Sequence, residues 1–351
     1  MAASSIQFPD KTDIKDRQLN ELFPFVMKAV QFLNNTNDYT TKEVGKTLAF
    51  LDDVFWKDQT AIPQEGFKHG LGGKLFVKIW KALSDHHTPS DRTQGGCNLK
   101  LMTGVFVNYT NDCSDIGCDL GKHGAIDCII DTLKKLEEQP EIKWKTKEMD
   151  SLIGIREWKT RELNTLLSIL HNSVKHDECA PNRSRYRKAE LDKPLKKLID
   201  SSELVIKLNS LLVFSYIARD SESEMLGRDK DVVVFLMRLL KKAVNAAAPK
   251  HECSGPGYAF GALDLLMGVH NLVVNDANKR IVLADQGILI ITRMLRNDFS
   301  EKDNQAAVKA LWNLSFDEDV RQSDDMRSAC SSMLINRCSP PWYYTGCIQF
   351  V

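Results

Sequence analysis

Cysteine and histidine are the residue types that most often bind metals in proteins, and they occur here in two groups. The groups contain Cys113, Cys118, His123 and Cys128, and then His171, His176 and Cys179. Neither group has the Cys-x2-Cys spacing that closes a structural zinc site. Cys128 also falls on the apolar side of a predicted helix, which suits a small core residue. The sequence therefore predicts no metal site.

The sequence has one glycine-rich segment that could bind phosphate, and it lacks the motifs of a nucleophilic serine or cysteine. The segment 70–74 resembles a phosphate-binding loop, but Lys68 replaces its first glycine and Leu75 replaces the Ser/Thr that would bind Mg²⁺. No serine lies in a glycine-flanked elbow, and no cysteine lies in a recognisable nucleophile motif. We therefore expect a protein that is not an enzyme and that holds no cofactor.

A basic cluster lies between positions 183 and 197. It contains Arg183, Arg185, Arg187, Lys188, Lys193, Lys196 and Lys197, interrupted by Glu190 and Asp192. Arginine forks fit carboxylates and phosphates, so an acidic peptide, a phosphate group or RNA would suit it. Nucleic-acid binding would need interleaved aromatic residues, and only Tyr186 is present. We favour a solvated helix face, and an enzyme site in this region is a weaker alternative.

Asparagine recurs near the ends of apolar helical segments. The segment 269–276 aligns with 311–318, which places Asn271 and Asn313 42 positions apart. Asn108 and Asn172 end similar apolar runs, and Tyr216 takes the corresponding place in a fourth. A carboxamide both donates and accepts hydrogen bonds, so a row of asparagines can bind the main chain of an extended ligand.

The segments between these markers have helical periodicity. Gly124 follows Asn108 by 16 positions, just as Gly287 follows Asn271, and each glycine is expected to mark a break where φ becomes positive or the chain turns sharply. Asp303 is expected in the N-cap region of the last helix. Sustained β-type alternation is absent. Helices are predicted over 42–56, 73–83, 157–172, 204–218, 231–244, 276–285, 287–296 and 303–316, and a further one is opened by Gly124 and closed by Pro140.

The uneven spacing of the markers indicates long loops or insertions over 138–157 and 245–258, with a further loop over 86–96. We expect an N-terminal helical region with a degenerate repeat over 1–96, repeats over 97–321, and a non-repeat tail over 322–351. The aromatic residues of that tail favour a shortened or alternative end of a longer protein.

These segments resemble the armadillo repeat family, whose members include β-catenin and importin-α. The similarity is best over 261–321, where 306–315 resembles the third helix of the repeat almost in full, and it is fair over 98–136. The resemblance implies an all-α fold, an armadillo-type α-solenoid that forms a right-handed superhelix of three-helix repeats. It also implies a concave groove lined by Asn108, Asn172, Tyr216, His270, Asn271, Trp312 and Asn313.

Two interpretations of these asparagines are open: they line a groove, or they satisfy neighbouring helix ends or face solvent. In importin-type grooves a tryptophan precedes each asparagine by four residues. Here these places hold Gly104, Ser168, Met267 and Lys309. Recognition of a nuclear localisation signal by that mechanism is therefore not expected.

Net charge, the absence of targeting signals and the cysteine content also bear on the expected function. Lys plus Arg and Asp plus Glu both total 47, so no global field attracts the chain to nucleic acid or lipid. No signal peptide or membrane span is evident, and nine scattered cysteines fit reduced thiols. We expect a cytoplasmic scaffold or adaptor in signal transduction, with a nuclear location left open, that binds an extended protein segment or a helix.

One alternative function rests on the resemblance alone. Some invertebrate chains carry a similar armadillo region before a Toll/interleukin-receptor domain that signals or cleaves NAD. The present chain would then be a regulatory relative that lacks the catalytic domain.

Overall fold

The protein is described by a computed structural model that covers residues 7–88, 92–138, 153–201, 203–218, 222, 227, 230–245, 253–255, 258–295 and 299–335. The chain divides into two compact units, Met1–Leu198 and Ile199–Val351. Each unit is a set of packed α-helices, which confirms the predicted all-helical fold class. None of the described helices combines the length and apolar character that a bilayer crossing requires.

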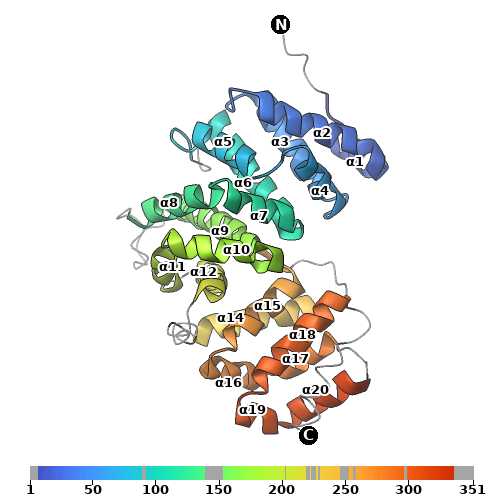
Figure 1. Cartoon of the computed structure of the whole chain (residues 1–351), viewed down its shortest axis with the longest axis vertical. Helices are drawn as coiled ribbons and strands as arrows, with labels where there is room; N and C mark the ends of the chain where they lie inside the picture. The colour runs from blue at the N-terminus through green and yellow to red at the C-terminus, as the bar shows by residue number, and fades with distance from the viewer. Residues whose placement is uncertain are drawn as a thin grey trace. The chain divides into compact units, whose positions relative to one another are not determined.

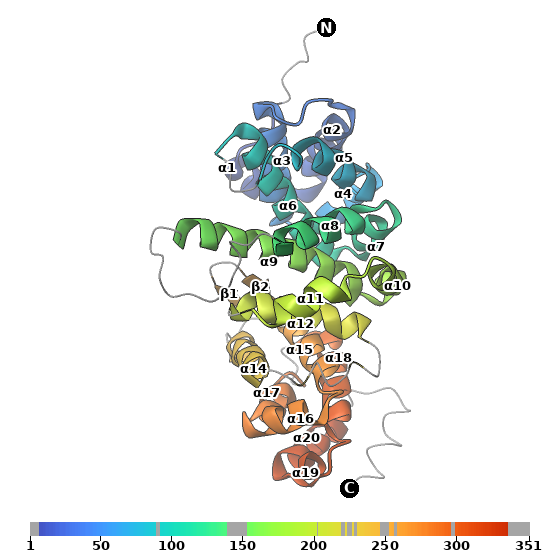
Figure 2. The same ribbon diagram turned by 90° about the vertical axis from the view of Figure 1, so that its left-hand side faces the viewer.

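The helices of the first unit follow one another in groups of three. From α4 onward, each third helix (α6 and α9) is the longest of its group, and α6 packs against both α3 and α9 (Figure 2). The elements are α1 Lys11–Asp16, α2 Leu19–Asn35, α3 Lys42–Phe55, α4 Ala61–Lys68, α5 Gly73–Leu83, α6 Gln94–Asp112, α7 Ser114–Lys122, α8 Ala125–Glu138, α9 Ile153–Lys175, a 3₁₀ turn η3 Asp177–Cys179, α10 Ala180–Lys188 and α11 Asp192–Ile199, whose last residue belongs to the second unit.

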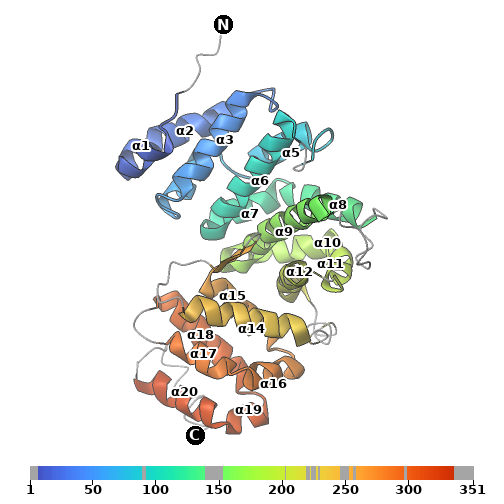
Figure 3. The same ribbon diagram turned by 180° about the vertical axis from the view of Figure 1, so that it is seen from behind.

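The second unit repeats this order of helices. Helix α15 packs against α12, α14 and α18, and Figures 1 and 3 show α15 beside α18 and α14 beside α15. Its elements are α12 Leu204–Ile217, α14 Lys230–Asn245, β1 Cys253–Gly255, β2 Tyr258–Phe260, α15 Ala262–Leu272, α16 Asp276–Ala284, α17 Gly287–Arg293, α18 Glu301–Leu314, α19 Glu318–Gln322 and α20 Asp324–Ile335.

Side chains that cap helix ends explain where several of these helices begin. The Thr93 hydroxyl accepts a hydrogen bond from Gly96 N at 3.1 Å and starts α6. Ser300 and Asp303 form a reciprocal capping box at α18, in which each side chain accepts from the backbone N–H of the other. Such caps satisfy N–H groups that have no partner inside the helix.

Aromatic contacts join neighbouring helices in the mainly aliphatic core of the first unit. The ring of Phe76 stacks on Trp80 at 5.4 Å and meets the ring of Phe106 edge-on at 4.9 Å, which joins α5 to α6. Tyr109 is fully buried, and its hydroxyl donates to the carbonyl of Leu51 on α3 at 2.8 Å. A buried phenol with a satisfied hydroxyl fixes helix register as well as adding apolar area.

Most predicted helices occur within a few residues of their expected bounds, and α5 matches its predicted range. Four details differ. The predicted loop over 86–96 is shorter because α6 already begins at Gln94, and Ser300 rather than Asp303 is the N-cap of α18. The expected helix start near residue 157 lies at Ile153, and the predicted break over 245–258 contains β1, which pairs antiparallel with β2.

The two marker glycines serve different purposes. Gly124 has φ +79°, as predicted for a break before α8. At the second break the positive φ of 59° belongs to Gln286 instead. Gly287 is needed for close approach, because a Cβ there would lie 2.4 Å from Val282 Cγ1 and 2.7 Å from the Val282 carbonyl oxygen.

The predicted domain bounds and the two units do not coincide. Helix α6 spans the expected boundary between 96 and 97, and α20 lies within the expected tail. The predicted insertion at 139–152 and the tail segment 336–351 lie outside the described residues.

Gly287→Ala should destabilise the second unit by about 1–3 kcal/mol, because the added methyl group must displace packed atoms. Gly104→Ala on α6 is the matched control, since no heavy atom lies within 4 Å of the Cβ position there. Alanine at 104 should stabilise by roughly 0.5–1 kcal/mol through helix propensity. Thermal or urea unfolding of both variants measures these effects, and equal stability of the two would contradict the packing argument.

Candidate functional site

The third helices of the first unit carry two of the predicted asparagines, and both donate hydrogen bonds to the helix before them. Asn172 Nδ2 on α9 donates to the Val107 carbonyl oxygen of α6 at 3.0 Å and to Thr110 Oγ1 at 3.3 Å. Asn108 Nδ2 on α6 donates to Asp52 Oδ1 of α3 at 2.9 Å. The amide nitrogens therefore link consecutive third helices.

The second unit repeats this contact between α18 and α15. Asn313 Nδ2 lies 3.3 Å from the His270 carbonyl oxygen and 3.1 Å from His270 Nδ1. The carbonyl that accepts belongs to the residue just before Asn271, just as Val107 precedes Asn108. This donation to the residue before the previous marker thus occurs in both units. We call the hydrogen bond from a marker asparagine to the preceding third helix the amide rung; Asn108 forms it with the Asp52 side chain instead of a carbonyl.

Asn271 departs from the pattern. Its Nδ2 is buried and has no hydrogen-bond partner among the described residues. On α12, which packs against α15, the marker position is occupied by Tyr216, whose hydroxyl oxygen is also buried. An unsatisfied buried N–H costs about 1–3 kcal/mol, and Asn271 contributes no amide rung to the second unit.

The amide rungs use only the side-chain nitrogen of each asparagine, and the side-chain oxygen takes no part in them. The Oδ1 atoms of Asn108, Asn172 and Asn313 accept no hydrogen bond from the described residues. Asn172 is buried, at 5% exposed, whereas Asn108 and Asn313 are partly exposed. Asn108 and Asn313 therefore keep an acceptor oxygen on a partly exposed side chain, while their N–H groups are already engaged.

The surroundings of His270 favour its neutral imidazole. Burial lowers the pKa of His270, and a backbone hydrogen bond with Lys309 opposes this shift only in part. Because Asn313 Nδ2 is a donor, its contact with His270 Nδ1 is a hydrogen bond in the tautomer whose Nδ1 carries no proton. Protonation of Nδ1 would place two donors against each other and break the rung.

Asp52 is the charged partner of the first rung. Burial raises the pKa of the Asp52 carboxyl, while the hydrogen bond from Asn108 lowers it. The neighbouring Asp53 carries an ion pair with Lys11 at 2.8 Å. Asn108 in the first unit therefore bonds to a carboxyl group, whereas Asn313 in the second unit contacts an imidazole.

Large apolar side chains are exposed in the turns that follow α15 and α18. Val274 and Phe316, again 42 positions apart, are 60% and 58% exposed. The Trp312 ring is half-buried and contacts Phe316 edge-on at 5.5 Å. Exposed aromatic and aliphatic groups beside a polar row are typical of a protein-binding surface.

The basic cluster lies on α10 and α11, and three of its members bond to nearby groups of the same unit. Arg183 Nη2 donates to the Val174 carbonyl oxygen at 3.3 Å. Lys193 pairs with Glu190 at 2.7 Å, and Lys196 with Asp192 at 3.3 Å. These contacts fit a solvated helix face. The remaining predicted members on these helices are Arg185, Arg187, Lys188 and Lys197.

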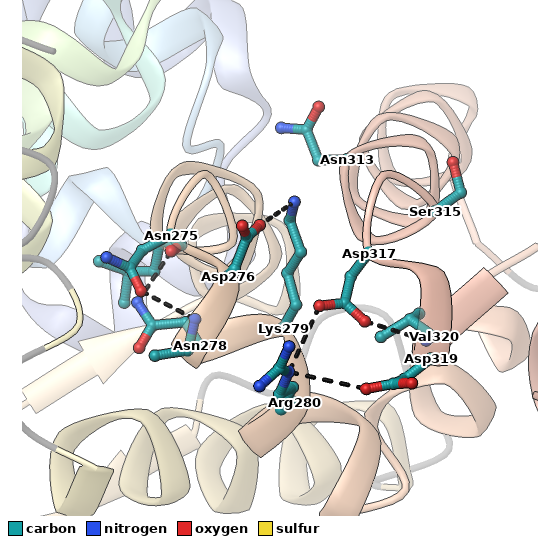
Figure 4. A network of polar contacts seen from close by, with 12 residues as sticks. Asn275, Asp276, Asn278, Lys279, Arg280, Asn313, Ser315, Asp317, Asp319 and Val320 are labelled. Carbon is teal, nitrogen blue, oxygen red and sulfur yellow. Dashed lines mark hydrogen bonds and ion pairs between the residues drawn. The ribbon is translucent and has the colours of Figure 1, made fainter.

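A polar network fixes the junction between the last two repeats (Figure 4). Asp317 caps α19 by accepting from Val320 N at 3.2 Å, and Arg280 Nε of α16 lies 3.5 Å from Asp317 Oδ2. One period earlier, Asn275 caps α16 by accepting from Ala277 N at 2.9 Å. The 42-residue period thus also governs the helix caps, which points to a structural role for this network.

The cysteine and histidine groups do not converge. Within the described residues, no three or more His, Cys, Asp or Glu side chains are placed to hold a metal ion. One close contact joins the two sequence groups, because Cys118 Sγ and Cys179 Sγ lie 3.1 Å apart.

Several residues that fix the site were missed by sequence reasoning. Asn98 Nδ2 donates to the carbonyl oxygens of Tyr39 at 2.7 Å and Thr41 at 2.9 Å, and so positions the start of α3. No repeat spacing marks Asn98. Val274 and Phe316 were detectable, because they occupy matching places in the aligned segments 269–276 and 311–318.

Comparisons with known proteins add no family. No family model and no curated protein matches the chain. Its fold is similar to a crystal structure of an engineered protein from the Northeast Structural Genomics Consortium, with 12% identity, 83% of this chain and 96% of that chain covered, and a TM-score of 0.41. A second engineered protein from the same consortium has 12% identity, coverage of 97% and 85%, and a TM-score of 0.35.

Asn172→Ala should lower the free energy of unfolding by about 1–2 kcal/mol, because it removes the rung between α9 and α6. Ser168→Ala on the same helix face is the matched control, since the Ser168 side chain makes no hydrogen bond among the described residues. Urea unfolding followed by circular dichroism compares the two variants. A loss in Ser168→Ala as large as in Asn172→Ala would exclude the rung as the cause.

His270 predicts a pH dependence with a defined sign. Because its folded pKa lies below the unfolded value, its contribution is fully present above about pH 6.5 and is lost as the pH falls through the folded pKa. The difference in melting temperature between wild type and His270→Gln should therefore change in that acidic window and stay constant above it. A difference that is flat across pH 5 to 8 would show that His270 does not control the rung.

Proposed function

We propose that this protein is an interaction module that binds a segment of another protein along the third helices of its second unit. The observation that carries the proposal is the exposure of Val274 and Phe316, 42 positions apart, in the turns that directly follow the third helices carrying Asn271 and Asn313. An apolar anchor beside a main-chain hydrogen-bonding group is what capture of an extended segment requires.

The ligand chemistry follows from the direction of the amide rungs. Asn313 donates internally, so its Oδ1 would accept from a main-chain N–H of the ligand. The half-buried Trp312 and the exposed Phe316 would receive an apolar ligand side chain. We therefore propose an extended, partly apolar segment as the partner, with no requirement for an acidic or basic one.

An armadillo-type arrangement is part of the same proposal. Support comes from the groups of three helices, from the contacts of α15 with α12 and α18, and from the caps Asn275 and Asp317 one period apart. A stacked repeat presents equivalent positions along one direction, which suits a ligand of repeating backbone.

Display of random peptides on phage against the purified full chain tests the function. Selected peptides should contain apolar residues, and Phe316→Ala should weaken their binding by about 1–2 kcal/mol, or roughly ten-fold in Kd by fluorescence anisotropy.

Leu289→Ala is the matched control for that experiment. Leu289 is also a large exposed apolar residue, 40% exposed, but it lies on α17 and outside the third helices. Its replacement should leave Kd unchanged. Equal losses in both variants, or none in Phe316→Ala, would contradict binding at this surface.

A further inference from the structure

Two cysteines of the first unit lie in direct contact although they are 61 residues apart in sequence. Cys118 is on α7, and Cys179 ends the 3₁₀ turn η3 behind α9; their sulfur atoms are 3.1 Å apart. Both carry free thiols, with Cys179 buried and Cys118 partly exposed. A disulfide needs a sulfur–sulfur distance near 2.05 Å, so a movement of about 1 Å separates this pair from a covalent bond.

The backbone on both sides holds the two sulfur atoms together. A Cβ at Gly117 would lie 3.2 Å from Cys179 Sγ, so glycine is what lets the turn approach α7 this closely. Asn182 Nδ2 donates to the Gly117 carbonyl oxygen at 3.0 Å and to that of Ser173 at 2.8 Å. These bonds tie α10, α9 and α7 at the level of the pair, so the contact does not depend on side-chain rotamers alone.

We propose that Cys118 and Cys179 are a redox modification site, at which hydrogen peroxide or a related peroxide converts the two thiols into an intramolecular disulfide. Cys118 is partly exposed to solvent, whereas Cys179 is buried. An oxidant can therefore reach Cys118, while Cys179 stays in place to complete the bond.

The chemistry balances in two steps. Cys118 sulfur attacks one peroxide oxygen, the O–O bond breaks, and Cys118 becomes a sulfenic acid with release of one water. Cys179 sulfur then attacks the sulfenic sulfur; the S–S bond forms, the S–O bond breaks, and hydroxide leaves with the Cys179 proton as a second water. In sum, two thiols and one peroxide give one disulfide and two waters.

The order of these steps follows from burial. Burial raises the pKa of the Cys179 thiol, and its hydrogen-bonding contact with Cys118 acts in the same direction. Since the thiolate is the reactive form, Cys179 is a poor first target for peroxide. In the reduced state it also lies 3.3 Å from the Ser114 carbonyl oxygen, to which its S–H donates.

Peptide mapping of the full chain tests the proposal. The reduced protein is treated with hydrogen peroxide, alkylated, digested without reductant and analysed by mass spectrometry. The expected result is a linked pair of peptides containing Cys118 and Cys179, two hydrogen atoms lighter than their sum, which is lost on treatment with dithiothreitol. Both cysteines should lose their alkylation label together.

Cys118→Ser and Cys97→Ser are the paired variants. Cys118 is only partly buried, so its replacement should preserve the fold, which circular dichroism checks. It should abolish the linked peptide, whereas replacement of the exposed Cys97 should leave it intact. The proposal is overturned if wild type, at peroxide doses that oxidise Cys97, keeps Cys118 and Cys179 separately alkylated, or links Cys118 to a different cysteine.

Discussion

A helix packed between two others must satisfy its polar side chains within the stack, and this constraint organises both units. Tyr109 and Asn172 donate to main-chain carbonyls of the preceding third helix, Leu51 and Val107, in the first unit. Asn313 does the same in the second unit. A helical carbonyl already accepts from its own helix, but it has a second lone pair that can accept again. Each such bond fixes the register of one helix against the next, which apolar contacts alone leave loosely defined.

The internal use of the asparagines bears out one of the two interpretations that the sequence leaves open, because their amide nitrogens satisfy neighbouring helices, whereas a groove stays a prediction. The amide nitrogens serve the stack, while the side-chain oxygens take no part in it. Under the proposed function, stability and binding would be divided between the two ends of one carboxamide. The specificity of such a surface would depend on the side chains beside the rung, such as His270 and Phe316.

The sequence was a good guide wherever the signal was local or periodic. Helical spacing located α5 and α12, and the 42-residue period located Asn271 and Asn313. It failed where the cause lies in another segment of the chain. The positive φ falls on Gln286, while Gly287 is required for close contact with Val282, and neither feature follows from the local sequence. The thiol pair of Cys118 and Cys179 was hidden for the same reason, since their proximity depends on how α7 packs against α9 and η3.

A disulfide between Cys118 and Cys179 would lie just after the end of α9, in a region that other contacts already fix. Three separate contacts already fix this region: Asn172 to Val107 on α6, Asn182 to Ser173 and Gly117, and the thiol contact of Cys179 with Cys118. Because the backbone is held before any oxidation, a disulfide there would change little in the geometry of the third-helix face. It would instead remove freedom from the unfolded chain by closing a long loop. Oxidation at this site would therefore raise the free energy of unfolding of the first unit and leave its folded geometry largely unchanged.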